Sequence, residues 1–311
     1  TSGATESNNL ALLGLEAFGR RTGRMHLVTS PVEHRAVLEP LEELVRRGFR
    51  LTVVPVTAGG FVEPGVVAAA IGDETLLVSV MAANNEIGVL QDLEAIAALC
   101  RSCGALFHCD AAQAVGHIPL QADALGIDLL SLSGHKLYGP KGCGALLLRP
   151  GVALAPQLHG GGQERGLRAG TPAVPLQVGL GVALELAASD LAPRSARLRT
   201  LRDQLWQGLE ALGDVSRNGH PLQTLPHNLN VSVAGVDGTR LHRLLRRRLA
   251  VSSGSACSQG SPSHVLAAIG RSPREAAASI RFGLGRWTTE AEILTALDAV
   301  DQAVAELRRA S

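Results

Sequence analysis

The sequence has 311 residues, of which 46% are hydrophobic and 18% are charged, and its formal net charge is +1. A chain of this length folds as about two domains and buries a substantial core, and its composition excludes a collagenous, disordered or disulfide-stapled protein. The near-neutral charge gives no basis for sequence-independent binding to nucleic acid or to an anionic membrane surface. We therefore expect no direct nucleic-acid partner and no membrane partner.

The cysteines are few and odd in number: Cys100, Cys103, Cys109, Cys143 and Cys257. A secreted disulfide framework is not expected, and a reducing compartment fits better. The spacing of Cys100 and Cys103 is that of a redox or metal pair, but a structural role is favoured because no second pair exists, so no metal is predicted. Since no apolar run approaches the roughly 20 residues of a spanning helix, and the first residues are polar where a signal peptide is apolar, the sequence predicts a cytoplasmic protein.

The first half of the chain alternates short apolar runs with helical periods, which predicts βαβ units and a mostly parallel sheet. The expected strands are His26–Thr29, Leu51–Val56, Thr75–Val80, Ala105–Cys109, Leu129–Ser131 and Gly144–Leu148. The expected helices contain Leu10, Leu13 and Ala17; Val37, Leu38, Leu41, Leu44 and Val45; and Leu93–Cys103. Gly48 and Gly104 are the expected ends of the second and third helices.

The pattern changes after about Asp190. A charged helix near Ala196–Leu212 precedes a strand at Asn228–Val233, and the last helix starts at Thr289. We predict a large domain at residues 1–190 and a smaller C-terminal α+β domain at residues 191–311. Between these elements lies a predicted helix rich in arginine, for which a solvated face is favoured over a partner-docking face; its arginines are Arg243, Arg246, Arg247 and Arg248.

Glycines are frequent between residues 134 and 170, where they allow tight turns or close approach to a ligand. On their own they are weak evidence for a site. The stretch Gly139-Pro140-Lys141-Gly142 is not a phosphate loop of the Walker type, because no Lys-Ser/Thr closes a G-x-x-x-x-G spacing. Nucleotide hydrolysis is therefore disfavoured.

Asp110 and Lys136 follow two neighbouring predicted strands, with Gln113 three residues after Asp110. Ligands of open α/β sheets bind outside the carboxyl ends of the strands, so these side chains are expected in one crevice. A pyridoxal phosphate enzyme needs such a pair, because a lysine holds the cofactor's aldehyde carbon and an acid keeps the pyridine nitrogen protonated. Neither residue alone indicates this chemistry, because a lone strand-end aspartate is usually a turn former and a lone lysine is usually solvated.

Together with several motifs, these residues resemble the cysteine desulfurases, which are class V, fold-type I pyridoxal phosphate enzymes. The resemblance implies an α/β fold-type I transferase, and Ser253-Gly254-Ser255-Ala256-Cys257 is similar to the group I branch. The motifs occur in the family's order: Thr1-Ser2-Gly3-Ala4-Thr5-Glu6-Ser7-Asn8-Asn9, Glu33-His34, Asn84-Asn85-Glu86-Ile87-Gly88, Asp110 with Gln113, Ser133-Gly134-His135-Lys136-Leu137-Tyr138-Gly139-Pro140-Lys141-Gly142, Gly160-Gly161-Gly162-Gln163-Glu164-Arg165 and Ser252-Ser253-Gly254-Ser255-Ala256-Cys257.

The resemblance implies a role for each residue around the cofactor ring. Lys136 would hold the cofactor and then move the substrate's α-proton. Asp110 would pair with the pyridine nitrogen, and Gln113 would donate a hydrogen bond to the phenolic oxygen. His34 would stack on the ring and act in acid–base steps.

The phosphate group of the cofactor has its own set of expected contacts, again implied by the resemblance. Ala4 and Thr5 would bind it near a helix N-terminus, which suits the preference of exposed backbone N–H groups for anions. Ser133 and His135 would complete the contacts. Thr171 would reach the phosphate of a neighbouring subunit, which implies a homodimer.

The expected substrate is L-cysteine, and the expected nucleophile is Cys257. Asn85 would contact the cofactor and, with Arg281, bind the substrate carboxylate, Arg281 by a two-pronged contact. The Cys257 thiolate would take the substrate sulfur as a persulfide and leave alanine. The sulfur would pass to an acceptor or iron–sulfur scaffold protein for cluster assembly or tRNA thiolation.

Two departures from the family pattern leave alternatives open. The segment that precedes the Thr1–Glu6 motif in family chains is absent from this sequence, and the stretch after Cys257 is shorter than in other group I members. The alternatives are another class V enzyme, such as a selenocysteine or cysteine-sulfinate lyase or an aminotransferase, and a truncated, inactive paralogue that binds a partner. A requirement for Cys257 would distinguish the desulfurase from the first of these.

Overall fold

A computed structural model describes residues 1–252 and 263–309, and Cys257 lies outside the described residues. The chain forms two compact units. The first comprises Thr1–Pro55, Val62–Asn84 and Gln91–Leu191, and the second comprises Val56–Phe61, Asn85–Leu90 and Ala192–Ser311. The units differ from the predicted domains in two short segments. Asn85–Leu90 counts with the second unit because its backbone bonds to that unit, with Leu90 N–H donating to Gln223 O and Leu225 N–H donating to Gly88 O.

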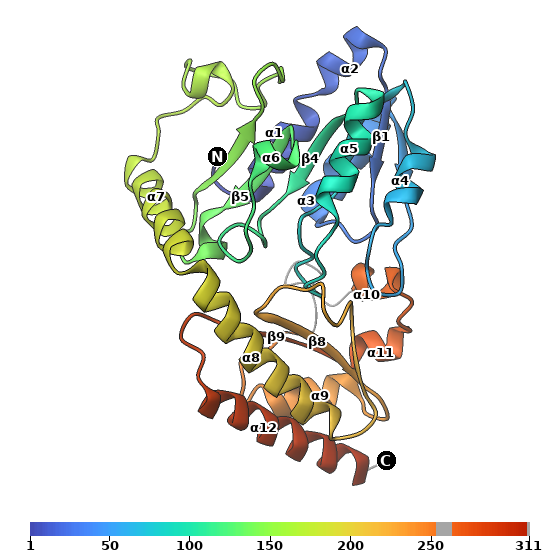
Figure 1. Ribbon diagram of the computed structural model, residues 1–311, viewed down its shortest axis with the longest axis vertical. Coiled ribbons are helices and arrows are strands. Elements are labelled where there is room, and N and C mark those ends of the chain that lie inside the picture. The colour runs from blue at the N-terminus through green and yellow to red at the C-terminus, as the bar shows by residue number, and fades with distance from the viewer. Residues whose placement is uncertain (253–262, 310–311) are drawn as a thin grey trace. The chain divides into compact units, whose positions relative to one another are not determined.

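The first unit is built on a six-stranded sheet in the order β2-β1-β3-β4-β5-β6 (Figure 1). Five strands are parallel and only β6 runs antiparallel to its neighbour, which confirms the prediction of a mostly parallel sheet. The inner strands are buried and apolar on both faces, as expected where helices cover a parallel sheet. The bounds are β1 His26–Thr29, β2 Arg50–Val53, β3 Thr75–Ser79, β4 Leu106–Asp110, β5 Leu129–Ser133 and β6 Gly144–Leu148.

Two of the three helices expected in the first half are present as α3 and α5, whereas the expected helix with Leu10, Leu13 and Ala17 on one face is divided into α1 and α2, which Gly14 and Leu15 separate. Helix α5 ends as predicted at Gly104, whose φ of 69° is the left-handed conformation that favours glycine at a helix end. The helical segments of this unit are α1 Ala4–Leu13, α2 Glu16–Thr22, α3 Arg35–Arg46, α4 Pro64–Ala70, α5 Leu93–Cys103, α6 Ala122–Leu125, η1 Gly134–Leu137, η2 Glu164–Gly166 and α7 Val174–Ser189. Leucines of α1 and α3 pack against the sheet in one core, which contains Leu12, Leu27, Leu41 and Leu77. Burying each of these side chains stabilises the fold by roughly 1.5–3 kcal/mol.

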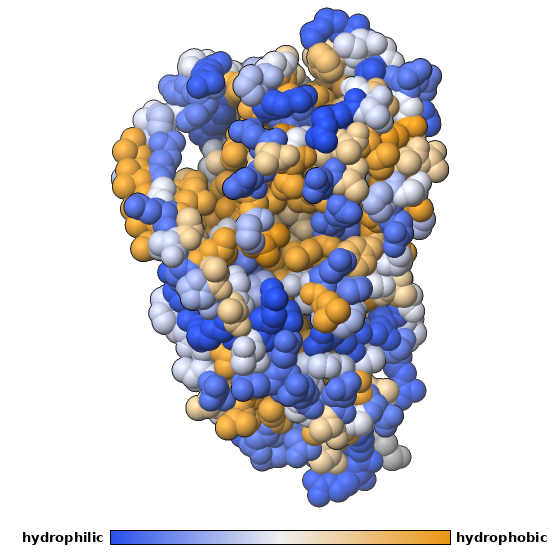
Figure 2. Space-filling view, viewed as in Figure 1, coloured by the Kyte–Doolittle hydropathy of each residue, from blue (hydrophilic) through white to orange (hydrophobic). Residues whose placement is uncertain are grey.

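Helix α7 is the one long helix that the sequence analysis did not anticipate. Four of its aliphatic side chains are half or more exposed, and they recur every four residues along one face: Val174, Val178, Val182 and Leu186. Figure 2 shows an apolar edge where Figure 1 labels α7. The sequence of α7 has no amphipathic pattern, because the side of the helix that faces solvent is apolar as well.

The second unit is an α+β layer with a three-stranded antiparallel sheet in the order β7-β8-β9. The chain enters it through α8, and helix α12 packs on the core that contains Val231, Ile280 and Val300. The predicted arginine-rich helix ends at Leu245, so three of its four arginines follow α9, and all four are exposed. The elements are α8 Leu191–Glu210, β7 Val215–Arg217, β8 Asn228–Val233, α9 Gly238–Leu245, α10 His264–Ala268, α11 Pro273–Ala277, β9 Ser279–Gly283 and α12 Glu290–Arg309.

Among the described residues, no single helix is long and apolar enough to cross a membrane. Helices α7 and α8 meet that test only when taken together, across a bend of 71°.

Candidate active site

The first unit carries a buried carboxylate at the carboxyl end of β4. Asp110 is 4% exposed. Its Oδ2 accepts a hydrogen bond from Asn8 Nδ2 at 2.7 Å, and its Oδ1 accepts one from the backbone N–H of Ala112 at 2.9 Å. A carboxylate has about four acceptor positions, so Asp110 keeps the capacity to accept from a further donor such as a protonated pyridine nitrogen. Gln113, half-buried, follows on the same loop.

Ser133 ends the neighbouring strand β5. In the β4–β5 register Asp110 lies opposite Ser131, so Ser133 is two residues further along the same edge of the sheet. Ser133 Oγ and His135 Nδ1 form a hydrogen bond of 2.8 Å. Burial, with the charges of Lys136 and Lys141, lowers the pKa of His135, which keeps its imidazole neutral at pH 7.

The N-terminus of helix α1 lies beside Ser133. A Cβ atom on Gly3 would be 3.5 Å from Ser133 Oγ, and Gly3 caps the helix without any side-chain hydrogen bond. The first N–H groups of a helix have no partner within the helix and attract anions. Ala4 and Thr5 begin this helix, so the structure brings together four of the residues expected to bind phosphate, and the donor set fits that group.

Lys136 lies in the 3₁₀ turn η1, directly after β5, and its side chain is exposed. Its backbone oxygen accepts a hydrogen bond from His117 Nε2 at 3.0 Å, which fixes the backbone of the turn. The glycines around Lys136 allow the close backbone packing of this turn. A Cβ on Gly134 would lie 3.0 Å from Pro140 O, and one on Gly139 would lie 2.9 Å from Gly134 O, so both positions need glycine for close backbone packing.

His34 is the N-cap of helix α3. Its Nδ1 accepts from the backbone N–H of Ala36 at 3.1 Å, which leaves the ring proton on Nε2 in the neutral form. Its neighbour Glu33 is fully buried and accepts hydrogen bonds from Met81 N–H at 2.9 Å and Ser30 Oγ at 3.1 Å. Burial, with the nearby charge of Asp110, raises the pKa of Glu33 to about 8.

Glu33 and Asn8 are site residues to which the sequence analysis gave no role. Both belong to motifs that it identified, since Glu33 precedes His34 and Asn8 belongs to the Thr1–Asn9 stretch. Nothing else in the sequence identifies them as site residues, because neither a glutamate nor an asparagine shows by its type that its side chain will be buried near Asp110. Thr171 is exposed just before α7.

The described cysteines are free thiols, and three of them, Cys100, Cys109 and Cys143, are buried. Burial raises the pKa of Cys100 to about 12 and that of Cys109 well above its usual range. Cys100 and Cys103 both belong to α5, and within residues 1–252 and 263–309 no group of three His, Cys, Asp or Glu residues could hold a metal ion.

In the second unit, the two residues expected to bind the substrate carboxylate are in contact. Arg281 lies on β9, and its guanidinium Nη1 donates to the backbone oxygen of Asn85 at 2.7 Å. Burial lowers the pKa of Arg281, and the negative charge of Glu86 opposes that shift. A half-buried guanidinium beside a backbone carbonyl retains donors for a carboxylate.

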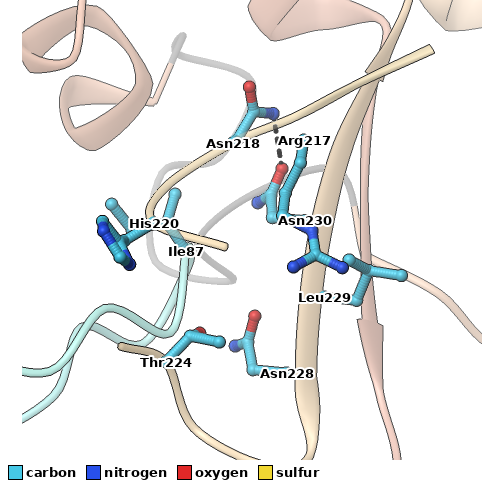
Figure 3. Close-up of a pocket in the computed structure, with 8 residues that line it drawn as sticks. All are labelled: Ile87, Arg217, Asn218, His220, Thr224, Asn228, Leu229 and Asn230. Carbon is cyan, nitrogen blue, oxygen red and sulfur yellow. Dashed lines mark hydrogen bonds between the residues drawn. The ribbon is translucent and has the colours of Figure 1, made fainter. Parts of the chain in front are cut away.

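A small pocket in the second unit is lined by side chains on and beside β8 (Figure 3). It has no space that a water-sized molecule could enter, so it is not a ligand site. Part of its polar lining is bonded internally, whereas Arg217 Nε and Asn228 Oδ1 have no hydrogen-bond partner among the described residues. The amide of Asn218 donates to Asn230 Oδ1 at 2.8 Å and to Ser232 Oγ at 2.9 Å. These contacts pack the sheet against Ile87 and its neighbours.

Three comparisons place this site among known proteins. A cysteine desulfurase, IscS of Shewanella baltica strain OS223, is 47% identical over 315 residues, which cover all of this chain and 78% of that protein. A solved NifS-like protein superposes with a TM-score of 0.91 at 37% identity, covering 99% of this chain and 82% of the other. The structure of SspA in complex with cysteine gives a TM-score of 0.79 at 39% identity, covering 93% and 81%.

The family model for aminotransferase class-V matches residues 1–295, nearly the whole chain. The buried aspartate, the strand-end serine and the lysine that follows it therefore lie on the fold of this family. The chain belongs to the aminotransferase class-V family and, within it, to the cysteine desulfurases.

Proposed function

We propose that this protein is a pyridoxal phosphate-dependent cysteine desulfurase that converts L-cysteine to L-alanine and passes the sulfur on. One observation carries the proposal most directly: Asp110 and Ser133 end adjacent parallel strands, and Lys136 follows Ser133 by three residues. This arrangement supplies an acid for the pyridine nitrogen, an anion site and an amine at one edge of one sheet. Bound pyridoxal phosphate supplies an electron sink that stabilises negative charge on the substrate's α-carbon.

The chain's own residues then have separate tasks. Arg281 binds and orients the substrate carboxylate through its planar fork of donors. Lys136 holds the cofactor and moves the α-proton. His34, whose Nδ1 accepts from the backbone, presents Nε2–H as the atom that moves or holds a proton.

Sulfur transfer requires a thiolate, which we assign to Cys257. Its sulfur bonds to the substrate sulfur as the C–S bond breaks, and the electron pair of that bond remains on Cβ, which takes a proton. The products are alanine and a persulfide on Cys257, so one cysteine and one thiol give one alanine and one persulfide with no external oxidant. The four other cysteines are poor candidates, and burial raises the thiol pKa of two of them, Cys100 and Cys109.

Alanine release from L-cysteine tests the proposal, with pyridoxal phosphate present and a reducing thiol to discharge the persulfide. We expect alanine and sulfide in equal amounts. Cys257→Ala should abolish both while retaining the visible absorbance of the bound cofactor. Cys143→Ala is the matched control, because Cys143 is a buried thiol in the same chain. A persulfide on another cysteine, or alanine release by Cys257→Ala, would contradict the proposal.

We further propose that the protein works as a homodimer formed through helix α7. Its exposed aliphatic face, Val174 to Leu186, is a contiguous apolar stripe of the kind that marks an interface. Thr171 lies three residues before this helix, so a second copy packed on α7 would bring its Thr171 near the partner. We also propose a cytoplasmic location and a sulfur-acceptor or iron–sulfur scaffold protein as the recipient.

Val178→Asp tests the dimer. A charge in the middle of the stripe should shift the mass in sedimentation equilibrium from dimer to monomer. Leu294→Asp is the control, because Leu294 is equally exposed on α12 but lies outside the stripe. A wild-type protein that sediments as a monomer at micromolar concentration would exclude the dimer.

A further inference from the structure

The segment Asn85–Leu90 is held within the second unit by side chains from separate elements. Asn230 on β8 donates through Nδ2 to Glu86 O at 3.1 Å. Arg281 on β9 donates to Asn85 O at 2.7 Å. Ser263 Oγ donates to the Glu86 carboxyl oxygen Oε2 at 2.5 Å. Figure 3 shows Asn230 and Ile87 among the side chains that line the pocket there.

The same contacts define where the chain enters and leaves residues 253–262. Ser252, the last described residue before them, exchanges two backbone hydrogen bonds with Arg281, of 3.3 and 2.7 Å. Ser263, the first described residue after them, is bonded to Glu86. The residues that flank the stretch containing Cys257 are therefore bonded to Arg281 on one side and to Glu86, the sequence neighbour of Asn85, on the other.

The Ser263–Glu86 contact is short and secluded. Glu86 is fully buried and Ser263 is 6% exposed. A hydrogen bond from a hydroxyl to a buried carboxyl group is stronger than one between exposed groups, because water does not compete for either partner. Exposed serine–glutamate contacts carry little energy by comparison, because water replaces them.

We propose that Ser263 and Glu86 are a positioning pair for the desulfurase reaction. Their hydrogen bond fixes the position of Ser263, the first described residue after the stretch that contains Cys257, relative to Arg281. We expect sulfur transfer to depend on this position, because Cys257 is six residues from Ser263 and has to reach the sulfur of a substrate whose carboxylate Arg281 holds. This inference rests on the proposed function and adds to it two residues to which that function gave no role.

Ser263 also caps helix α10, since its Oγ accepts from Leu266 N–H at 3.1 Å. The chain offers a matched control for that second role. Ser272 caps the equally short helix α11, accepting from Glu275 N–H at 3.3 Å and donating to Glu275 Oε2 at 2.7 Å. Its serine–glutamate contact is exposed and stays within its own helix. Ser272→Ala therefore measures the loss of a cap alone.

The test compares four variants in alanine release from L-cysteine, with substrate binding followed by the absorbance change of the bound cofactor. We expect Ser263→Ala to lower kcat roughly tenfold or more with KM changed less than about twofold, since the lost contact acts on the reacting group and not on binding. Ser263→Thr, which keeps the hydroxyl, should restore kcat. Ser263→Gly should lower kcat as Ser263→Ala does, because glycine is well tolerated at an N-cap but has no hydroxyl to donate to Glu86. Ser272→Ala should match the wild type.

Equal kcat in Ser263→Ala and Ser272→Ala, or a fully active Ser263→Gly, would overturn the positioning role while leaving the desulfurase assignment intact. A wild-type protein that binds L-cysteine but releases no alanine would instead overturn the proposed function, and the positioning role with it. Glycine is well tolerated at an N-cap, so Ser263→Gly gives a result even where Ser263→Ala lowers stability too far for assay.

Discussion

The two units contain different kinds of buried polar cluster. In the first unit two buried carboxyl groups lie near the candidate cofactor site, Asp110 at the end of β4 and Glu33 before α3. In the second unit a cluster of neutral amides and hydroxyls lies on and beside β8, where Asn218 bonds to Asn230 and to Ser232. A buried charge at a sheet edge is costly and indicates a reactive site, whereas a hydrogen-bonded neutral cluster indicates packing. Variants of Asp110 should therefore affect chemistry, whereas variants within the Asn218 cluster should affect stability.

The largest effect is expected from Lys136→Ala. Without its amine the protein should bind pyridoxal phosphate only reversibly and release alanine at background rates, a loss of roughly a thousandfold or more in line with removal of a covalent or acid–base residue. Lys141→Ala is the control, because Lys141 is exposed in the same loop. Equal activity in the two variants would show that Lys136 is not the reactive lysine. The measurement is alanine release together with the cofactor's visible spectrum.

Asp110→Asn should cause the second largest loss of alanine release. Its amide removes the negative charge expected to hold the pyridine proton and turns a donor towards the Asn8 amide. Breaking a buried charge interaction costs about 3 kcal/mol or more, which corresponds to roughly a hundredfold loss of alanine release. Asp128→Asn is the control, because Asp128 is equally buried but pairs with Arg149 and with Phe107 N–H. Equal kcat loss in both variants would argue for a structural role of Asp110.

The sequence predicted the sheet well because its strands are apolar and end in recognisable residues. His26–Thr29 and Gly144–Leu148 were predicted to the residue, and Leu93–Cys103 was predicted by its capping glycine. Helix α7 was not predicted, because its exposed face and its buried face are both apolar and leave no amphipathic period. The resemblance to family motifs identified the candidate site residues, but a motif does not show which side chains are buried.

That limit explains why Glu33 and Ser263 were assigned no chemistry. Glu33 acquires its raised pKa only through long-range packing against Met81 and Asp110. Ser263 meets Glu86 across 177 positions of the chain. Neither contact has a local pattern, so only the folded chain reveals it.

Glu33→Gln tests whether the buried carboxyl group of Glu33 makes the free energy of unfolding depend on pH. Burial raises the pKa of Glu33 from 4.5 to about 8, so the folded state keeps a proton that the unfolded chain loses. The free energy of unfolding should therefore fall as pH rises from 4.5 towards 8, by up to about 1.4 kcal/mol per unit. Glutamine mimics the protonated acid and should flatten this slope, as measured by urea unfolding between pH 5 and 8. Glu39→Gln, on an exposed residue, should retain the wild-type slope; an unchanged slope in Glu33→Gln would contradict the assignment.

The smallest effect, and the one expected to lower stability without altering chemistry, is that of Asn218→Ala in the second unit. Asn218 is 2% exposed, and its Oδ1 also accepts from Arg271 Nε at 2.6 Å. Its loss leaves buried partners unsatisfied and should lower the free energy of unfolding by about 1–3 kcal/mol. Gln302→Ala, which removes an exposed amide bonded to Asp298, should change it by less than about 0.5 kcal/mol.

The cofactor spectrum distinguishes Asn218→Ala from Asp110→Asn. Asn218 bonds to Asn230, to Ser232 and to Arg271, all within the second unit, so its loss should leave the visible absorbance and the affinity for pyridoxal phosphate unchanged. Asp110→Asn should have the opposite effects, a changed cofactor spectrum and a smaller change in the free energy of unfolding. If Asn218→Ala altered the cofactor spectrum as strongly as Asp110→Asn, the division between the reactive carboxylate and the packing cluster would fail, because the Asn218 cluster would then act on the chemistry.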